Sequence, residues 1–129
     1  MHRSQKMEAF VLSRRNIGEA DRLVTLFTRE QGIVRAIAKG VRKVPSSRGG
    51  HLEPFTQVLA LVRVSRAGTY LEGVETKEYF SALKSRPNVL VHAQAMVHLI
   101  VSVLGEEDAH PRVYDALEEA LLTLPNISE

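Results

Sequence analysis

Short apolar runs that end at turn-forming residues make up most of the first eighty positions of the chain. The runs span residues 8–15, 22–28, 33–39, 55–64 and 69–76. They are rich in aliphatic and β-branched residues, whereas the segments between them are rich in Gly, Asn, Asp, Ser and Pro. Runs of this length and composition predict β-strands. The second and third runs are joined by a short, Gly-containing segment, which predicts a hairpin.

Alternation within the third run predicts which of its faces lies inside. Alternate residues of a strand point to opposite faces. One face carries Ile33, Arg35, Ile37 and Lys39, and the other carries Val34, Ala36 and Ala38. The face of smaller residues suits a barrel interior, so two cations point outward. Five short strands with a long connection between the third and fourth predict a five-stranded oligonucleotide-binding (OB) barrel.

The pattern becomes helical after Glu78. Residues 79–84 predict a short helical turn, and 89–104 predict a helix that ends at Gly105. A second helix is expected over 111–124, capped by Asp108 or His110. Its apolar face comprises Val113, Ala116, Leu117, Ala120, Leu121 and Leu124.

The helix expected over 89–104 is apolar on nearly every side. This pattern is typical of a helix that is buried between two layers. The barrel can form one layer, and further helices must form the other, so we expect the chain to be an amino-terminal part of a longer protein. The predicted fold class is therefore α+β, with an OB-fold domain over 1–78 and the start of an α-helical domain over 79–129.

Positive charge is concentrated in the amino-terminal part of the chain. Residues 1–50 hold 11 Lys and Arg against 4 Asp and Glu, a net charge of +7, whereas 51–129 hold 6 against 11, a net charge of −5. Cations displace the counterions condensed on nucleic acid, so a basic half predicts a partner with a phosphate backbone. The cations expected to converge on one face are Lys39, Arg42, Lys43, Arg35, Arg48, Arg14, Arg15 and Arg22.

Aromatic residues for base stacking are scarce in this chain. Phe10, Phe27, Phe55 and Phe80 fit core positions, whereas Tyr70 is assigned to neither the core nor the surface. Binding is therefore expected to rest on phosphate contacts, with little sequence preference and a steep dependence on salt.

Motifs for catalysis are missing from the sequence. The chain has no phosphate-binding Walker loop, no nucleophile elbow and no paired-histidine zinc motif, and it contains 0 cysteines. His92 and His98 point about 120° apart around a helix, which disfavours a shared metal. We expect no enzymatic activity, no cofactor and no metal. No apolar run is long enough to span a membrane or form a signal peptide, so a cytoplasmic location is expected. With a nucleic-acid partner, the protein is expected to be nucleoid-associated.

Three separate motifs closely resemble the start of the bacterial RecO family of recombination mediators. The motifs are Gly18-Glu19-Ala20-Asp21-Arg22 after the first apolar run, Ala38-Lys39-Gly40-Val41-Arg42-Lys43, and Leu52-Glu53-Pro54-Phe55. The resemblance implies an amino-terminal OB fold that binds single- and double-stranded DNA. It also implies annealing of complementary strands and loading of RecA together with RecR, on strands coated with single-stranded DNA-binding protein.

Carried over by position, the family's basic surface falls on Lys39, Arg42 and Lys43. Asp21 and Arg22 are expected to pair and fix the turn between the first two strands. Many family members carry a four-cysteine zinc element in a carboxy-terminal half, which lies outside this chain. Two alternatives remain open from the residues: a protein-interaction module that docks an acidic partner tail, and an OB domain that binds RNA.

Overall fold

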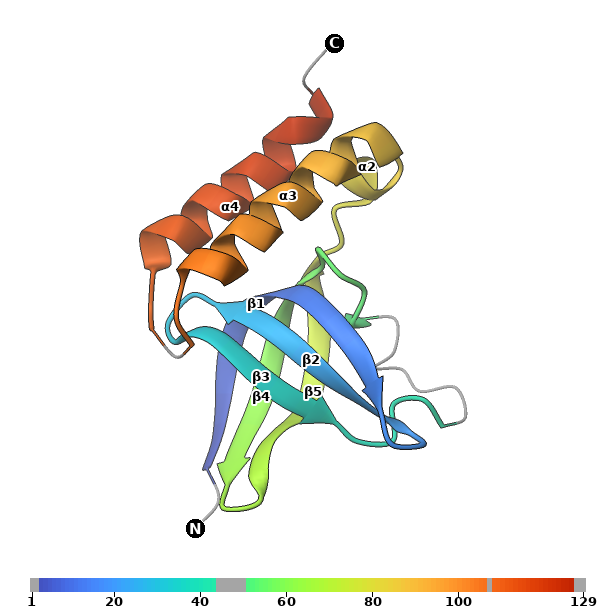
Figure 1. Ribbon diagram of the computed structural model, residues 1–129, viewed down its shortest axis with the longest axis vertical. Helices are drawn as coiled ribbons and strands as arrows, with labels where there is room; N and C mark the ends of the chain where they lie inside the picture. Colours follow the sequence, from blue (N-terminus) through green and yellow to red (C-terminus); the bar gives the residue numbers. More distant parts are fainter. Residues whose placement is uncertain (1–2, 44–50, 107, 127–129) are drawn as a thin grey trace.

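Five strands form a closed barrel in the computed structural model, which describes residues 3–43, 51–106 and 108–126 (Figure 1). The strands are β1 (Arg3–Ile17), β2 (Asp21–Thr28), β3 (Gly32–Ala38), β4 (Gln57–Ser65) and β5 (Gly68–Glu78). Their order around the barrel is β1-β2-β3-β5-β4. Neighbouring strands are antiparallel, except for the parallel pairing of β3 with β5 that closes the barrel. The predicted five-stranded OB barrel is confirmed.

The first strand is longer than its apolar run predicted. It begins at Arg3 rather than Glu8, because its first part pairs with β4 from Arg3 to Phe10. Its second part pairs with β2 from Ala9 to Ile17. Backbone pairing on both sides thus extends the strand through polar residues that carry no apolar pattern.

The interior of the barrel is lined by small and branched aliphatic side chains. Ala36 and Ala38 are 0% exposed, which confirms that the small face of β3 points inward, and Arg35 is exposed on the opposite face. The remaining members of this core come from the other four strands, the segment just after β3 and the segment before β4. They include Ala9, Val11, Val24, Leu26, Leu52, Val58, Ala60, Val62 and Leu71.

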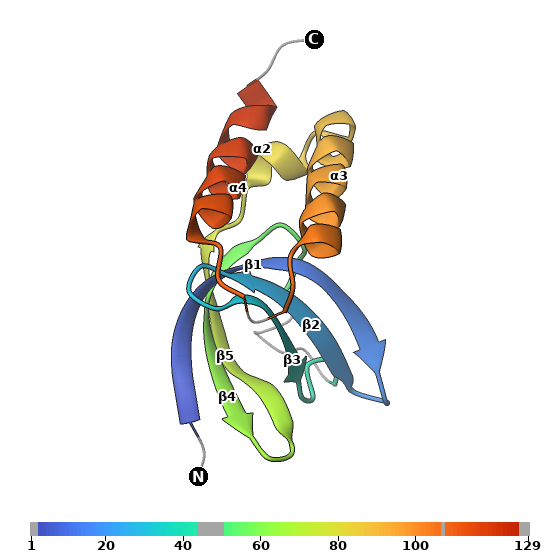
Figure 2. The same ribbon diagram turned by 60° about the vertical axis from the view of Figure 1, so that its left-hand side comes forward.

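Two helices lie side by side over one end of the barrel (Figure 2). They are α3 (Pro87–Val103) and α4 (Pro111–Thr123), preceded by the single turn α2 (Ser81–Lys84) and followed by the 3-10 helix η1 (Leu124–Asn126). Both helices begin at a proline, whose fixed φ angle suits the first helical position. His110 is the N-cap residue of α4, but its side chain makes no capping hydrogen bond. His110 therefore occupies the predicted cap position without a side-chain capping bond, and Asp108 Oδ2 lies 3.2 Å from His110 Nε2.

A second core joins the helices to the outside of the barrel. Tyr114 of α4 is 1% exposed, and its ring centroid lies 4.7 Å from that of Phe10 and 5.6 Å from that of Phe27. Phe55 and Phe80 belong to the same cluster, so the predicted core positions of the four phenylalanines are confirmed. Arg29 also forms a two-pronged ion pair with Asp115, at 3.0 Å for each contact.

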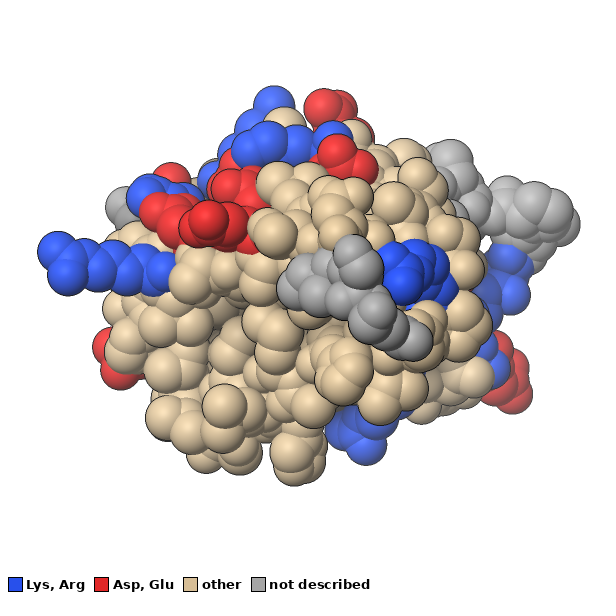
Figure 3. Space-filling model, turned by 90° about the horizontal axis from the view of Figure 1, so that it is seen from above, with Lys and Arg blue, Asp and Glu red and all other residues tan. Residues whose placement is uncertain are grey.

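Helix α3 is buried on one side rather than on two. Val89, Ala93 and Val97 are buried, but Val91, Leu99 and Val103 are 60%, 63% and 70% exposed. Seen from the helical end, most of the surface carries neither positive nor negative side chains (Figure 3). Among the residues that the structure describes, none of the helices combines the length and the apolarity needed to span a bilayer.

Candidate nucleic-acid interface

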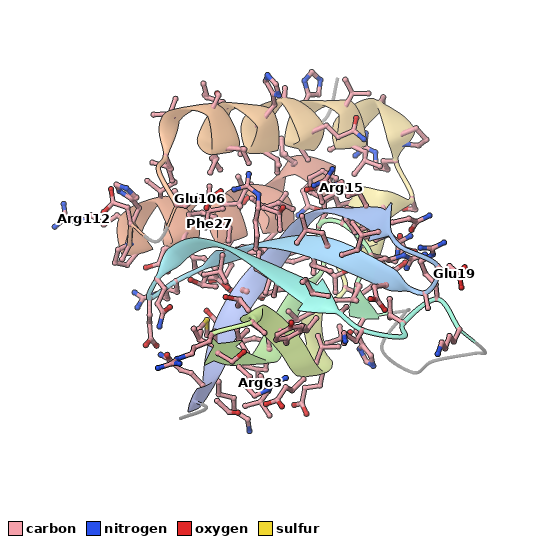
Figure 4. All side chains as sticks on the ribbon, turned by 60° about the horizontal axis from the view of Figure 1, so that its bottom comes forward. Arg15, Glu19, Phe27, Arg63, Glu106 and Arg112 are labelled. Atoms are coloured by element: carbon pink, nitrogen blue, oxygen red, sulfur yellow. The ribbon has the colours of Figure 1, made fainter. Side chains whose placement is uncertain are left out.

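A row of outward-facing residues crosses all five strands of the barrel. Arg15 pairs with Leu23, Leu23 with Ile37, Ile37 with Tyr70, and Tyr70 with Arg63. Residues that pair across neighbouring strands share a face of the sheet. The row therefore places two half-buried aliphatic side chains and a half-buried aromatic ring between two arginines. Figure 4 labels its two ends, Arg15 and Arg63.

A cavity beside this row is lined by three arginines, two on β1 and one on β3. It has a volume of about 410 Å³. Its lining consists of Ser13, Arg14, Arg15, Leu23, Thr25 and Arg35. The Arg35 guanidinium also forms an ion pair with Glu106, in the connection between α3 and α4. Three of the predicted cations, Arg14, Arg15 and Arg35, thus line one cavity beside β1 and β3.

A second, more open hollow lies at the end of β3. It has a volume of about 570 Å³ and is lined by Glu19, Ala20, Asp21, Lys39, Gly40 and Lys43. The Gly40 backbone N–H donates to Asp21 Oδ1 at 2.8 Å, which fixes the start of the basic segment against the β1–β2 turn. Lys39 and Lys43 are both exposed here. The Lys39 ammonium lies 5.9 Å from the centroid of the Tyr70 ring, so the hollow adjoins the row.

Two other predicted cations, Arg42 and Arg22, form a cluster that stabilises the β1–β2 turn. Arg42 Nη1 donates to the carbonyl oxygens of Gly18 and Asp21, both at 3.1 Å. Arg22 Nε donates to Asn16 Oδ1 at 3.3 Å. Partial burial lowers the pKa of Arg22, and the positive charges of Arg14 and Arg42 lower it further.

The pairing predicted between Asp21 and Arg22 is replaced by other contacts. Asp21 accepts its hydrogen bond from Gly40, whereas Arg22 donates to Asn16. Arg14 forms an ion pair with Glu53 at 3.3 Å. The turn is therefore stabilised by a wider set of contacts than a single ion pair, and Arg42 contributes to the fold as well as to the charge.

The predicted cations therefore do not all converge on one face. Arg15, Arg35, Lys39 and Lys43 line the outer face and the adjoining hollow, while Arg14 lies at the border of the turn cluster. Arg48 lies outside the described residues. The row also contains four residues that were not among the predicted site residues, namely Leu23, Ile37, Tyr70 and Arg63. Alternation along each strand could have placed Leu23, Ile37 and Tyr70 on outer faces. It could not have shown that Tyr70 lies beside Ile37, because the barrel closure sets that pairing.

The described residues contain no group of three or more His, Cys, Asp or Glu side chains that is placed to hold a metal ion. What the outer face offers is a set of cations beside half-buried apolar groups. Such a surface can neutralise phosphates and contact the planar faces of bases.

Comparisons with known proteins identify relatives of the chain. Residues 1–80 match the family described as "Recombination protein O N terminal". Over 51 residues the chain is 61% identical to the "DNA repair protein RecO" of a Nocardioides species, a match that covers 40% of this chain and 21% of that protein. The protein of the same name from Bifidobacterium adolescentis is 52% identical over 60 residues, which cover 46% of this chain and 24% of that protein.

A longer match reaches into the helices. The "DNA repair protein RecO" of a Synechococcus species is 36% identical over 114 residues, which cover 81% of this chain and 40% of that protein. The matched stretches thus span less than half the length of each of these relatives.

Proposed function

The chain belongs to the recombination protein O family of DNA repair proteins, and from this premise we propose that it is a DNA-binding part of a recombination mediator. It binds single- and double-stranded DNA and acts by binding rather than by catalysis. The observation that carries the proposal is the outward-facing set of cations on an OB barrel, Arg15, Arg35, Lys39 and Lys43. OB folds typically hold oligonucleotides on the face of the second and third strands and on the adjoining loops.

The charges favour DNA as the ligand on physical grounds. Each lysine or arginine that contacts a phosphate releases a condensed counterion, which supplies affinity independently of sequence. The exposed cations lie on β1, on β3 and just after β3, so they can follow a backbone across the sheet rather than meet one compact anion. The carboxylates of Glu19 and Asp21 line the same hollow and repel phosphates. A bound strand must therefore place its phosphates near the lysines and away from these carboxylates.

Strand annealing follows from the same surface. Two complementary strands repel each other through their phosphates, and a cationic surface that contacts both lowers this repulsion and speeds their encounter. Family membership suggests RecR and the single-stranded DNA-binding protein as partners, and RecA as the recombinase that is loaded as a result. These partners are proposed for the full-length proteins of the family, and this chain is similar to their amino-terminal part.

A charge-matched pair of variants tests the DNA-binding surface. The Lys39→Ala/Lys43→Ala variant removes two exposed cations from the hollow, and Lys6→Ala/Arg112→Ala removes two exposed cations elsewhere. Arg112 is the second residue of α4 and lies on the opposite side of the molecule from Glu19, which lines the hollow (Figure 4). Arg42 is left intact because its hydrogen bonds stabilise the β1–β2 turn.

Fluorescence anisotropy with a labelled single strand, and a strand-annealing assay, provide the measurements. We expect the first variant to lose roughly tenfold in affinity and to anneal more slowly, and the control to behave as the unmodified chain does. Equal affinity for all three proteins would contradict the site. Preference for structured RNA of the same length, or saturation by an acidic peptide with no competition from DNA, would favour one of the two alternative functions instead.

A further inference from the structure

Tyr70 is a partly exposed aromatic side chain on the outer face of the barrel. It lies where the barrel closes, paired with Ile37 of β3 on one side and with Arg63 of β4 on the other. The next residue, Leu71, is 2% exposed and belongs to the barrel core. Because alternate residues of a strand point to opposite faces, Tyr70 points outward. The Tyr70 ring therefore stands outside the core rather than contributing to it.

Cations and a turn surround the ring. The Arg63 guanidinium lies 4.9 Å from the ring centroid, and the Lys39 ammonium lies 5.9 Å from it. Glu72 accepts a hydrogen bond from Arg63 Nε at 2.9 Å, which helps to hold the guanidinium over the ring. The Tyr70 hydroxyl donates to the Ala67 carbonyl oxygen at 3.4 Å, so the ring is also tied to the β4–β5 turn.

Gly68 lies beside one edge of the Tyr70 ring. A Cβ atom at this position would lie 3.8 Å from ring atom Cε2. Gly68 therefore contributes no side-chain atoms at this edge, whereas any other residue would place its Cβ in van der Waals contact with the ring. Next along the row, Ile37 and Leu23 are half-buried and continue an apolar strip across the sheet.

From this juxtaposition we propose that Tyr70 is the stacking platform of a subsite for one unpaired nucleobase, with Ile37 and Leu23 as its apolar floor. The subsite rests on the proposed DNA-binding function and deepens it. Arg63 on β4 and Lys39 just after β3 both lie near the Tyr70 ring and are placed to contact the phosphates that flank the base. A base in a single strand offers its face to an aromatic ring, whereas the bases of a duplex are already stacked on one another. The subsite therefore selects single-stranded DNA.

Tyr79 provides an internal comparison. It is 43% exposed, but the Lys84 ammonium lies only 3.5 Å from its ring centroid, closer than the 4.9 Å and 5.9 Å that separate Arg63 and Lys39 from the centroid of the Tyr70 ring. It also lies beside a different cavity, lined by Phe55, Leu90 and Gln94 among others. Exposure of an aromatic ring alone thus does not identify the subsite. Tyr70 is distinguished by its place in the row, next to the apolar side chains of Ile37 and Leu23.

The chain contains 0 tryptophans, which allows a direct optical test. The Tyr70→Trp variant and the Tyr79→Trp control each carry a single indole. Each is titrated with oligothymidylate and with a duplex of the same length, while the anisotropy of a labelled strand reports binding in parallel. We expect oligothymidylate to quench the indole of the Tyr70→Trp variant and the duplex to quench it far less, with no quenching in the control.

Binding by two further variants completes the test. Tyr70→Phe keeps the ring and should retain affinity, whereas Tyr70→Leu should lose about tenfold for the single strand and little for the duplex. Circular dichroism checks that both variants are folded. DNA binding without quenching, together with equal affinity of the Leu and Phe variants, would overturn the subsite and leave the proposed function standing. Absence of DNA binding by the unmodified chain would overturn the proposed function and the subsite with it.

Discussion

Replacing Gly32 by alanine measures how closely the connection between α3 and α4 approaches the barrel. Gly32 begins β3 with a φ of 71°, a left-handed conformation that alanine adopts at a cost of about 1–2 kcal/mol. A Cβ atom here would also lie 2.2 Å from the carbonyl oxygen of Asp108 and 2.7 Å from its carbonyl carbon. Both are backbone atoms, so the connection itself has to move away from β3.

Gly40 provides a matched control for the backbone strain. Its φ is 69°, nearly that of Gly32, but nothing lies within 4 Å of a Cβ atom added there. Displacing the connection disturbs the bridge between Ile33 and Glu106 and the ion pair between Arg35 and Glu106, together worth about 1–2 kcal/mol. We therefore expect Gly40→Ala to lower the free energy of unfolding by about 1–2 kcal/mol, and Gly32→Ala to lower it by about 2–4 kcal/mol.

Urea denaturation followed by far-ultraviolet circular dichroism gives both free energies of unfolding from one set of experiments. The informative quantity is the difference between the two variants, because the cost of the left-handed conformation cancels. Equal losses for Gly32→Ala and Gly40→Ala would refute the close approach of the α3–α4 connection to β3.

Two other variants test the contacts that attach the helices to the barrel. Tyr114→Phe removes one acceptor of the Gln57 side-chain amide, which also donates to Glu118 at 2.7 Å. In urea denaturation we expect it to lower the free energy of unfolding by about 1 kcal/mol, against about 3–5 kcal/mol for Tyr114→Ala. Similar losses for both variants would show that the ring contributes little. Burial lowers the pKa of Lys84 to about 8 from 10.5, so the unfolded chain binds more protons between these values and stability should rise with pH across that window. Lys84→Met should lack this part of the rise when urea midpoints are compared from pH 8 to 10.5, and an identical pH dependence would contradict the assigned cause.

The barrel could be predicted from the sequence because its signals are local. Apolar runs, turn residues and the alternation in β3 each act over a few residues, and they placed Arg35 outside and Ala36 inside correctly. The extension of β1 to Arg3 could not be predicted in the same way, because pairing with β4 stabilises a polar segment that has no strand pattern.

Only part of the candidate site could be predicted, because its other features depend on contacts between segments distant in sequence. Charge counts identify which segment is basic, but they do not distinguish a cation that faces solvent, such as Lys43, from one that bonds backbone carbonyls, as Arg42 does. The row through Tyr70 and Arg63 depends on the register of β5 against β3 and β4. That register is set by barrel closure between segments distant in sequence, and no short-range pattern encodes it.

The salt dependence of binding to single-stranded DNA tests the central claim most directly. The slope of the logarithm of the binding constant against the logarithm of salt concentration reports the number of phosphates neutralised, at about 0.7 per contact for a single strand. We predict that Lys39→Ala/Lys43→Ala flattens this slope by about 1.4, and that Lys6→Ala/Arg112→Ala leaves it unchanged. An unchanged slope for the first variant, or equal flattening for both, would contradict the assignment of the outer face of the barrel as the DNA-binding surface.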